Sequence, residues 1–268
     1  MTEVESVKTQ QRCTWGCLAA DLLSAAYASA LVSPWAAVAD KLVYNKAIGS
    51  SVSCSLRSWV SKPRILASSL AMSFLVYFAT YATANCFDSF YARNNCTDAA
   101  ATFVSPCKFF ATTAVGIGSG VYKDGYFAHA ASRTPVPLLS YALFTARDVV
   151  TLFASCTLPT MIAPELAVFS GAVASRASEW FGSEESRLQV ARVMAPVAAQ
   201  IVGTPIHLLG LDVHHRRDGV SAAARFGSVW RHFRVCAPLR MVRIMPAFGI
   251  GGAANTDCRG MMLGRLTG

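Results

Sequence analysis

The chain has 268 residues, of which 53% are hydrophobic and only 15% are charged, with a mean hydropathy of +0.39 and a formal net charge of +9. So small a polar fraction cannot cover the surface of a water-soluble domain of this size. The composition therefore excludes an ordinary soluble globular protein and indicates a membrane protein.

The first residues, MTEVESVKTQQR, contain Glu3 and Glu5 and lack a basic segment followed by an apolar run. This pattern is not that of a secretory signal, nor that of an arginine-rich, acid-poor transit peptide. We expect any targeting information to lie further inside the chain.

Six apolar blocks follow in chain order, and each is expected to form a helix. The blocks over residues 22–39, 65–87 and 193–211 approach the roughly 20 residues that span a bilayer. Three weaker blocks have buried helices of a soluble protein as their alternative reading: residues 109–122, 136–164 and 244–256. The strong blocks favour an all-α membrane protein with six transmembrane helices.

Two interleaved series of residues indicate internal repeats. A hydroxyl residue beside a helix breaker recurs at near-equal intervals, at Ser33-Pro34, Ser119-Gly120 and Thr204-Pro205. An arginine before an apolar helix recurs between them, at Arg64, Arg147 and Arg243. The pattern predicts three tandem two-helix repeats with pseudo-threefold symmetry, over residues 14–93, 99–164 and 186–262 of one transmembrane domain, 1–268. Each first helix is expected to end near the breaker, and each second helix to begin close to the arginine.

Small residues at helical spacing support this pairing, because helices in lipid associate where small side chains let their backbones approach. One row stands before Pro34 and another before Pro205, and they are Ala20, Ser24, Ala28 and Ala191, Ala195, Ala199. The middle block keeps only Ala114 at the corresponding places, and a frequent residue such as alanine can also match by chance.

The last repeat carries the most specific pattern. After Asp218-Gly219, the chain runs Arg240-Met-Val-Arg243-Ile-Met-Pro246-Ala247-Phe-Gly-Ile250. Three two-helix units with this R-x-x-R-x-x-P-A-x-x-I run resemble the mitochondrial carrier family, over roughly residues 14–260, although outside the third repeat the likeness rests on spacing. The resemblance implies a carrier of the mitochondrial inner membrane that works by alternating access.

The ion-pair gates of that family have no direct counterpart here. The positions that should be acidic and basic after Pro34 are Ala36 and Ala39, and after Pro205 the acidic position is His207. Charged residues just beyond these positions offer a shifted network. The candidate kink and gate region therefore comprises Pro34, Asp40, Lys41, Gly120, Lys123, Asp124, Pro205, His207 and Asp212. A second gate near the C-terminus is hinted at by Thr256-Asp257 with Arg259.

The resemblance places Arg64, Arg147 and Arg243 at three substrate contact points, one per repeat. Arginine holds carboxylate or phosphate with a bidentate fork, which favours a small anionic substrate, a carboxylate or a nucleotide. Two alternatives stay open: Arg64 follows Pro63 and can lie at the membrane interface, and Arg147 can pair with Asp148. His207 fits a hydrogen-bonded packing residue better than a proton relay.

Basic residues are concentrated in alternate connections. Segments 41–64 and 212–243 are rich in Lys and Arg, whereas 87–108 and 165–192 are mixed or acidic. This asymmetry predicts six spans with both termini opposite the basic side. In the carrier family the basic side faces the matrix, which implies the inner mitochondrial membrane, with the outer membrane as the alternative; the arginines can also simply neutralise lipid headgroups.

No Ser/His/Asp set, paired carboxylates or metal-ligand spacing stands out, and the nine cysteines fit small buried apolar residues. We therefore expect no enzymatic activity, cofactor, metal or nucleic-acid partner. The expected partners of a monomer are membrane lipids and a small anionic solute. The alternative function, favoured by the missing gate pairs, is a non-transporting scaffold, assembly factor or outer-membrane insertion factor.

Overall fold

The computed structural model describes residues 3–47, 49, 63–93, 98–132, 134–166, 183–216 and 219–267, and in this part of the chain every regular element is a helix. In chain order the elements are α1 (Glu3–Ala47), α3 (Pro63–Arg93), α4 (Asp98–Ser132), α5 (Leu138–Cys156), α6 (Leu158–Ile162), α9 (Glu184–Ala198), α10 (Gln200–His215), α11 (Ala222–Pro246), the π-helix η1 (Ala247–Gly251) and α12 (Gly252–Thr267).

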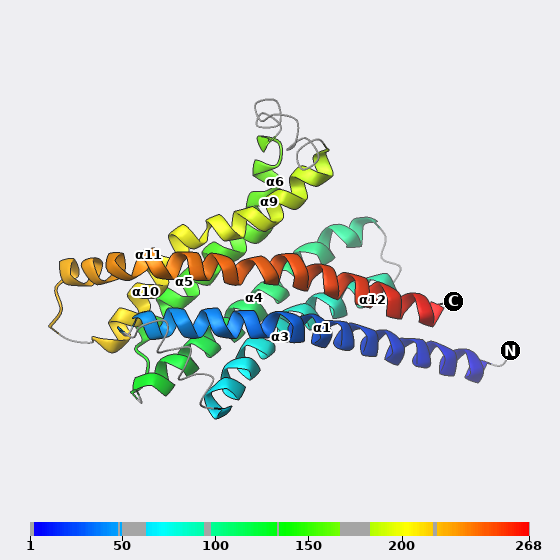
Figure 1. Cartoon of the computed structure of the whole chain (residues 1–268). Helices are drawn as coiled ribbons and strands as arrows, with labels where there is room; N and C mark the ends of the chain where they lie inside the picture. Colours follow the sequence, from blue (N-terminus) through cyan, green and yellow to red (C-terminus); the bar gives the residue numbers. More distant parts are fainter. Residues whose placement is uncertain are drawn as a thin grey trace.

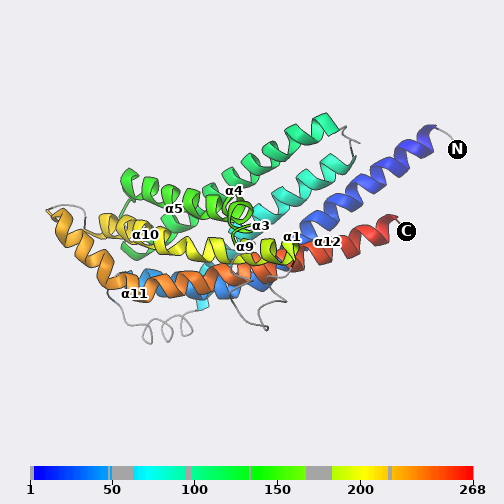
Figure 2. The ribbon, with the colours of Figure 1, turned by 90° about the horizontal axis from the view of Figure 1, so that it is seen from above.

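The long helices pack as a closed ring. Going round it, α1 packs on α3, α3 on α4, α4 on α5, α5 on α10, α10 on α11, and α11 with α12 packs back on α1. Figures 1 and 2 show α11, η1 and α12 forming one long rod beside α1, with both chain termini at the same end of the bundle. We call this the terminal end. The opposite, linker end holds the last turns of α1 and α10 and the first turn of α11.

In the described part of the chain, four helical segments are long and apolar enough to cross a membrane: Trp15–Ala47, Pro63–Tyr91, Leu138–Ser155 and Glu184–His215. They contain the three strong blocks of the sequence and the central part of the weaker block at 136–164. The blocks at 109–122 and 244–256 are helical, but they do not reach that threshold in the described residues. The all-helical membrane protein is thus confirmed, while six spans in three symmetric repeats are not.

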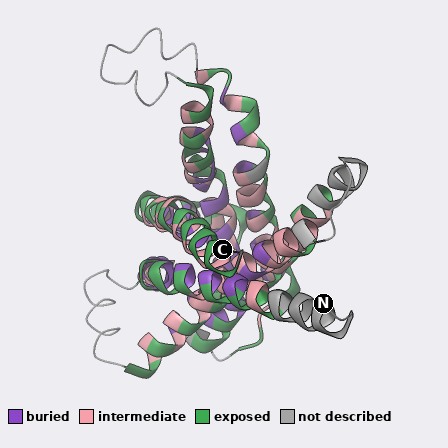
Figure 3. Cartoon of the chain, turned by 90° about the vertical axis from the view of Figure 1, so that its right-hand side faces the viewer, coloured by how far each residue is buried: buried purple, intermediate pink, exposed green. Residues whose placement is uncertain are grey.

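The burial pattern is that of a bundle surrounded by lipid. Large apolar side chains point outward from several helices, among them Leu23, Tyr27, Leu31, Trp35, Phe110, Ile201 and Val202. Polar and charged side chains instead gather inside, where Figure 3 shows the buried residues along the bundle axis. An apolar solvent around the protein favours this inverted arrangement.

Most small side chains of the two predicted rows are buried. Ala20, Ser24 and Ala28 are fully or almost fully buried on one face of α1, and Ala191 and Ala195 are buried on α9. The middle helix departs from the pattern, because Ala114 is exposed there.

The helix breakers do not end helices, which corrects the sequence-based prediction. Helix α1 continues through Pro34 to Ala47, α4 continues through Gly120 to Ser132, and α10 continues through Pro205 to His215. In lipid, neighbouring helices and hydroxyl side chains satisfy the backbone groups that a proline frees. Ser33, for example, donates from Oγ at 3.5 Å to the Ala30 carbonyl, which is the group that Pro34 leaves without its helical N–H partner.

The second helix of each pair begins close to its arginine only once. Arg64 follows the first residue of α3, but α5 starts at Leu138 and α11 at Ala222, well before Arg147 and Arg243. These two arginines therefore lie inside the bundle rather than at a helix start.

The linker end of the bundle is closed by apolar packing. Two adjoining groups of buried side chains lie there, Tyr44, Phe127, Ala128, Phe144 and Leu211 in one and Val43, Leu208, Val229 and Cys236 in the other. Gly210 permits this approach, since a Cβ on it would come within 2.7 Å of the Phe144 ring. We refer to these two groups together as the apolar plug.

Candidate functional site

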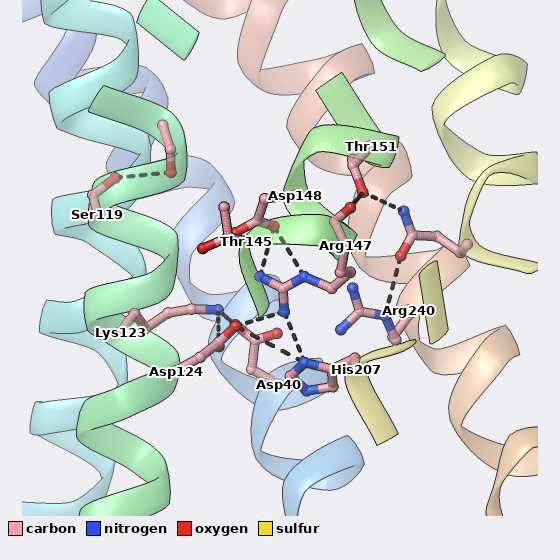
Figure 4. A network of polar contacts seen from close by, with 12 residues as sticks. Asp40, Ser119, Lys123, Asp124, Thr145, Arg147, Asp148, Thr151, His207 and Arg240 are labelled. Carbon is pink, nitrogen blue, oxygen red and sulfur yellow. Dashed lines mark hydrogen bonds and ion pairs between the residues drawn. The ribbon is translucent and has the colours of Figure 1, made fainter. Parts of the chain in front are cut away.

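A group of charged side chains lies buried next to the apolar plug, and five helices contribute to it (Figure 4). We call it the ionic cluster, and its members are Asp40 from α1, Lys123 and Asp124 from α4, Arg147 and Asp148 from α5, His207 from α10, and Arg240 and Arg243 from α11. Burying an ion costs several kcal/mol, so a cluster of this size inside lipid-facing helices marks a functional site.

Arg147 is the centre of the ionic cluster. Its Nη1 donates to Asp124 Oδ2 at 2.5 Å, and its Nε and Nη2 donate to Asp148 Oδ1 at 2.9 and 2.6 Å. The same Nη1 lies 2.8 Å from His207 Nδ1. Because an arginine only donates, this His207 nitrogen accepts, and the imidazole is the neutral tautomer with its proton on Nε2. Arg147 therefore links α5 to both α4 and α10.

Asp40 connects the first helix to two others. Its Oδ2 receives a short contact from Lys123 of α4, and its Oδ1 lies 3.0 Å from Arg243 Nε of α11. Lys123 also lies 3.4 Å from the neighbouring Asp124 carboxylate. The carboxylate of Asp40 thus joins the first, middle and last parts of the chain.

Arg240 is the member of the cluster with a neutral partner. Its side chain is buried, and its Nε donates to Gln200 Oε1 at 3.1 Å, while Gln200 donates in turn to Thr151 Oγ1 at 3.3 Å. The described cluster holds four cationic side chains and three carboxylates, with His207 neutral. One positive charge is therefore in excess, and the arrangement favours the approach of an anionic group.

A second polar group lies near the terminal end, and we call it the terminal cluster. Arg259 of α12 donates from Nε to Asp21 Oδ1 of α1 at 2.6 Å and from Nη2 to Ser89 Oγ of α3 at 2.9 Å. Asn85 of α3 and Asn255 of α12 bond each other beside this pair. At 1.5 Å per helical residue, Arg259 lies about 24 Å along its rod from Arg243.

The terminal cluster borders a cavity of about 380 Å³ between α3, α4 and α12. Its polar lining comes from Asn85, Asp88, Lys108, Asn255, Thr256 and Arg259. The bundle is consequently asymmetric, with the ionic cluster and the apolar plug filling its linker end and a cavity in its terminal half.

The structure brings together most of the residues singled out in the sequence. The shifted network forms from Asp40, Lys123 and Asp124, with Arg147, His207 and Arg243 joined to it. Gly120 lies against it, since a Cβ there would come within 2.9 Å of Asp148 Oδ2. The alternative pairing of Arg147 with Asp148 and the reading of His207 as a hydrogen-bonded residue both describe what is observed.

Other predicted residues lie elsewhere. Arg64 is exposed in the first turn of α3, and neither it nor Lys41 forms an ion pair with the cluster in the described structure. Asp212 binds Arg216 and Arg225 at the linker end instead. Pro34 is exposed and Pro205 half-buried, and neither marks a break. At the C-terminus, where the sequence hinted at a second gate, Arg259 pairs with Asp21 rather than with Asp257.

Several site residues were missed in the sequence. Asn85 and Asp21 are polar residues within apolar helices, and this is itself a signal of function in a membrane protein. Asn255 stands in the weakest apolar block, and Gln200 lies between two apolar residues of another. Their partners are distant in sequence, so no local spacing could reveal the contacts.

Comparison with known proteins gives the family. A family model described as "Probable citrulline exporter" matches residues 24–263, which is most of the chain. The resemblance to the mitochondrial carrier family is therefore wrong: the spacing of Arg240 and Arg243 that resembled the carrier pattern places both side chains in the ionic cluster. The match supports a membrane transporter of a small solute and gives no indication of the mitochondrial inner membrane. No curated protein and no solved structure matches the chain.

Proposed function

Because the chain belongs to the family of probable citrulline exporters, we propose that it exports a small zwitterionic amino acid of the citrulline type through the ring of helices. The observation that carries the proposal is the ionic cluster, which five helices place inside a bundle with an apolar outer surface. Buried charges of this kind line the paths of solutes in membrane proteins.

The two ends of the bundle support transport by alternating access. The cluster and the apolar plug close the linker end, while the cavity provides space in the terminal half. Export requires the opposite state as well, in which α1, α4, α5 and α11 separate at the linker end and their ion pairs break. A zwitterion eases this step, because its carboxylate and ammonium replace the lost partners without changing the net charge.

The excess positive charge assigns a role to the solute carboxylate. Arg240 has a neutral partner, Gln200, and a buried guanidinium gains most from an incoming carboxylate. The proposal keeps one part of the sequence-based expectation, namely that an arginine binds a carboxylate of the solute. Arg147 and Arg243 hold the cluster together, and Arg240 receives the carboxylate. Arg64, which is exposed, has no part in this binding.

The three-repeat architecture forms part of the proposal. Three helix pairs follow one another along the chain, α1 with α3, α4 with α5, and α10 with α11, and the ring of packed neighbours closes on itself. Six crossings in three related hairpins would give this ring. The mitochondrial location stays a prediction, and it no longer has the support of the carrier-family resemblance. Fractionation of cells that express the tagged protein tests this location. The absence of enzymatic activity also stays a prediction.

Counterflow in proteoliposomes tests the function. Vesicles that contain the purified protein and unlabelled citrulline should accumulate external labelled citrulline, and vesicles without protein should not. Arg147→Gln, which leaves Asp124 and Asp148 without their shared cation, should abolish the signal. Wild-type protein that is folded and moves neither citrulline nor a related amino acid would overturn the proposal and favour the non-transporting alternative.

A further inference from the structure

The cavity of the terminal half has an amide pair in its wall. Asn85 Nδ2 donates to Asn255 Oδ1 at 2.9 Å, and Asn255 Nδ2 donates back to Asn85 Oδ1 at 2.9 Å. Both residues line the cavity, and both are buried, with exposures of 3% and 8%. A reciprocal pair of this kind presents to each amide the donor and acceptor that another amide-like group would present.

The side-chain amides of Asn85 and Asn255 differ in their number of hydrogen-bond partners. Asn85 Nδ2 has three acceptors within reach, because it also lies 3.0 Å from the Asp21 carbonyl and 3.1 Å from Ser24 Oγ. Two hydrogens cannot serve three acceptors fully, so Asn85 keeps two good bonds if Asn255 turns away. When Asn255 turns toward the cavity, the bond from its Nδ2 to Asn85 Oδ1 is also lost, so the exchange is favourable where a ligand N–H donates to Asn85 Oδ1 and a ligand carbonyl accepts from Asn255 Nδ2.

Charged groups stand around the same cavity. Lys108 of α4 and Asp88 of α3 form a half-exposed ion pair with 2.5 Å between Nζ and Oδ1, and Arg259 lies on the α12 side. Lys108 and Asp88 can exchange each other for the carboxylate and ammonium of an amino acid in this cavity, at a stage separate from its contact with Arg240, since exposed ion pairs are worth little. The volume of about 380 Å³ lies within the range of small-ligand sites.

We infer that this cavity is a recognition site for the exported amino acid, in which Asn255, supported by Asn85, binds the neutral ureido group of the side chain. The inference rests on the proposed function and names the part of the molecule that selects the substrate. A ureido group offers a carbonyl and N–H donors to the two amides. An ammonium group, such as that of ornithine, only donates hydrogen bonds and has no acceptor for the Asn255 N–H groups, so it fits the amide pair worse than a ureido group.

A change of selectivity tests this assignment. Asn255→Asp replaces the neutral amide by a carboxylate and should shift the ratio of citrulline to ornithine counterflow toward ornithine by roughly tenfold or more, because the carboxylate accepts the ammonium and no longer donates to the ureido carbonyl. Asn255→Ala should lose citrulline preference without gaining ornithine. Asp257→Asn changes the charge of an exposed neighbour on α12 and serves as the control, with an unchanged ratio.

Citrulline binding to the detergent-purified protein distinguishes a failure of the site assignment from a failure of the proposed transport function. Calorimetric titration should give a citrulline affinity that falls about tenfold or more in Asn255→Ala, with thermal unfolding confirming that the variant is folded. A wild type that moves citrulline while the Asn255 variants keep its affinity and selectivity would overturn the assignment and leave the proposed function standing. Citrulline binding that depends on Asn255, in a protein that transports no solute, would support the assignment of the site and overturn the proposed function. No binding by the wild type would overturn the site.

Discussion

Arg243 Nε lies 3.0 Å from Asp40 Oδ1, which joins the last helix pair of the chain to the first at the level where the bundle closes. The same carboxylate contacts Lys123 of α4 through its other oxygen. Three helices from distant parts of the sequence therefore depend on one acidic side chain, and the first prediction follows from this.

Asp40→Asn should destabilise the protein strongly. The substitution leaves Lys123 and Arg243 buried beside a neutral amide, and removing one partner of a buried ion pair costs roughly 3–5 kcal/mol. We expect a clear drop in the unfolding temperature in detergent, together with loss of counterflow. Lys41→Gln removes a charge from the next residue, which forms no ion pair with the cluster in the described structure, and should leave both measurements near wild type. Equal effects of the two substitutions would contradict the role given to Asp40.

Arg240→Met should separate stability from transport. The guanidinium of Arg240 is buried against a neutral amide in a cluster with excess positive charge, so methionine relieves charge repulsion, and this offsets the roughly 1–3 kcal/mol lost when the buried Gln200 Oε1 loses its donor. The unfolding temperature should stay or rise while citrulline counterflow falls, because the carboxylate loses its partner. Arg243→Met is the matched comparison and should lower both, since Asp40 then keeps only Lys123.

Swapping the two charges of the Asp21–Arg259 ion pair should destabilise the protein less than reversing either charge alone. Asp21→Arg alone sets two guanidiniums together, and Arg259→Asp alone sets two carboxylates together, so each should lower the unfolding temperature. The double substitution restores opposite charges at the same contact and should recover part of the loss. A double variant no better than the sum of the singles would show that this contact contributes little to the terminal end.

Alanine substitutions at two glycines should change the free energy of unfolding in opposite directions. Gly210→Ala forces a methyl group to within 2.7 Å of the Phe144 ring in the apolar plug and should cost about 1–3 kcal/mol in unfolding free energy. Gly118→Ala meets nothing within 4 Å on the outer side of α4 and should be neutral or slightly stabilising, by up to about 1 kcal/mol. Thermal unfolding of the two variants side by side measures the difference.

The crossing of the last rod can be tested by labelling. In the structure, α11 begins at the linker end and α12 finishes at the terminal end, although hydropathy alone does not mark this rod as a span. A tag inserted at the exposed Gly219 and a tag at the C-terminus should therefore be digested from opposite sides of sealed vesicles. Digestion of both tags from the same side would contradict six crossings and favour four.

Structural features that depend on the local sequence could be predicted well. The apolar blocks became helices because their composition leaves no alternative in lipid, where every backbone group must be satisfied within its own segment. Most of the small residues in the rows before Pro34 and Pro205 are buried, as the helical spacing predicted. Charged residues next to the expected gate positions were recognised as a possible network because they interrupt apolar helices.

The tertiary structure alone decided how those residues combine. Whether Arg147 would face Asp148, Asp124 or a solute depends on where α4 and α10 pass, and whether Arg259 would pair with Asp257 or Asp21 depends on the position of α1. Arg64 and Arg147 hold equivalent places in the sequence pattern, yet one is exposed and the other buried. The sequence by itself determined a helical membrane protein with charges inside its helices; the packing of distant helices decided which charges meet, because an ion pair depends on distances in space that spacing along the chain does not contain.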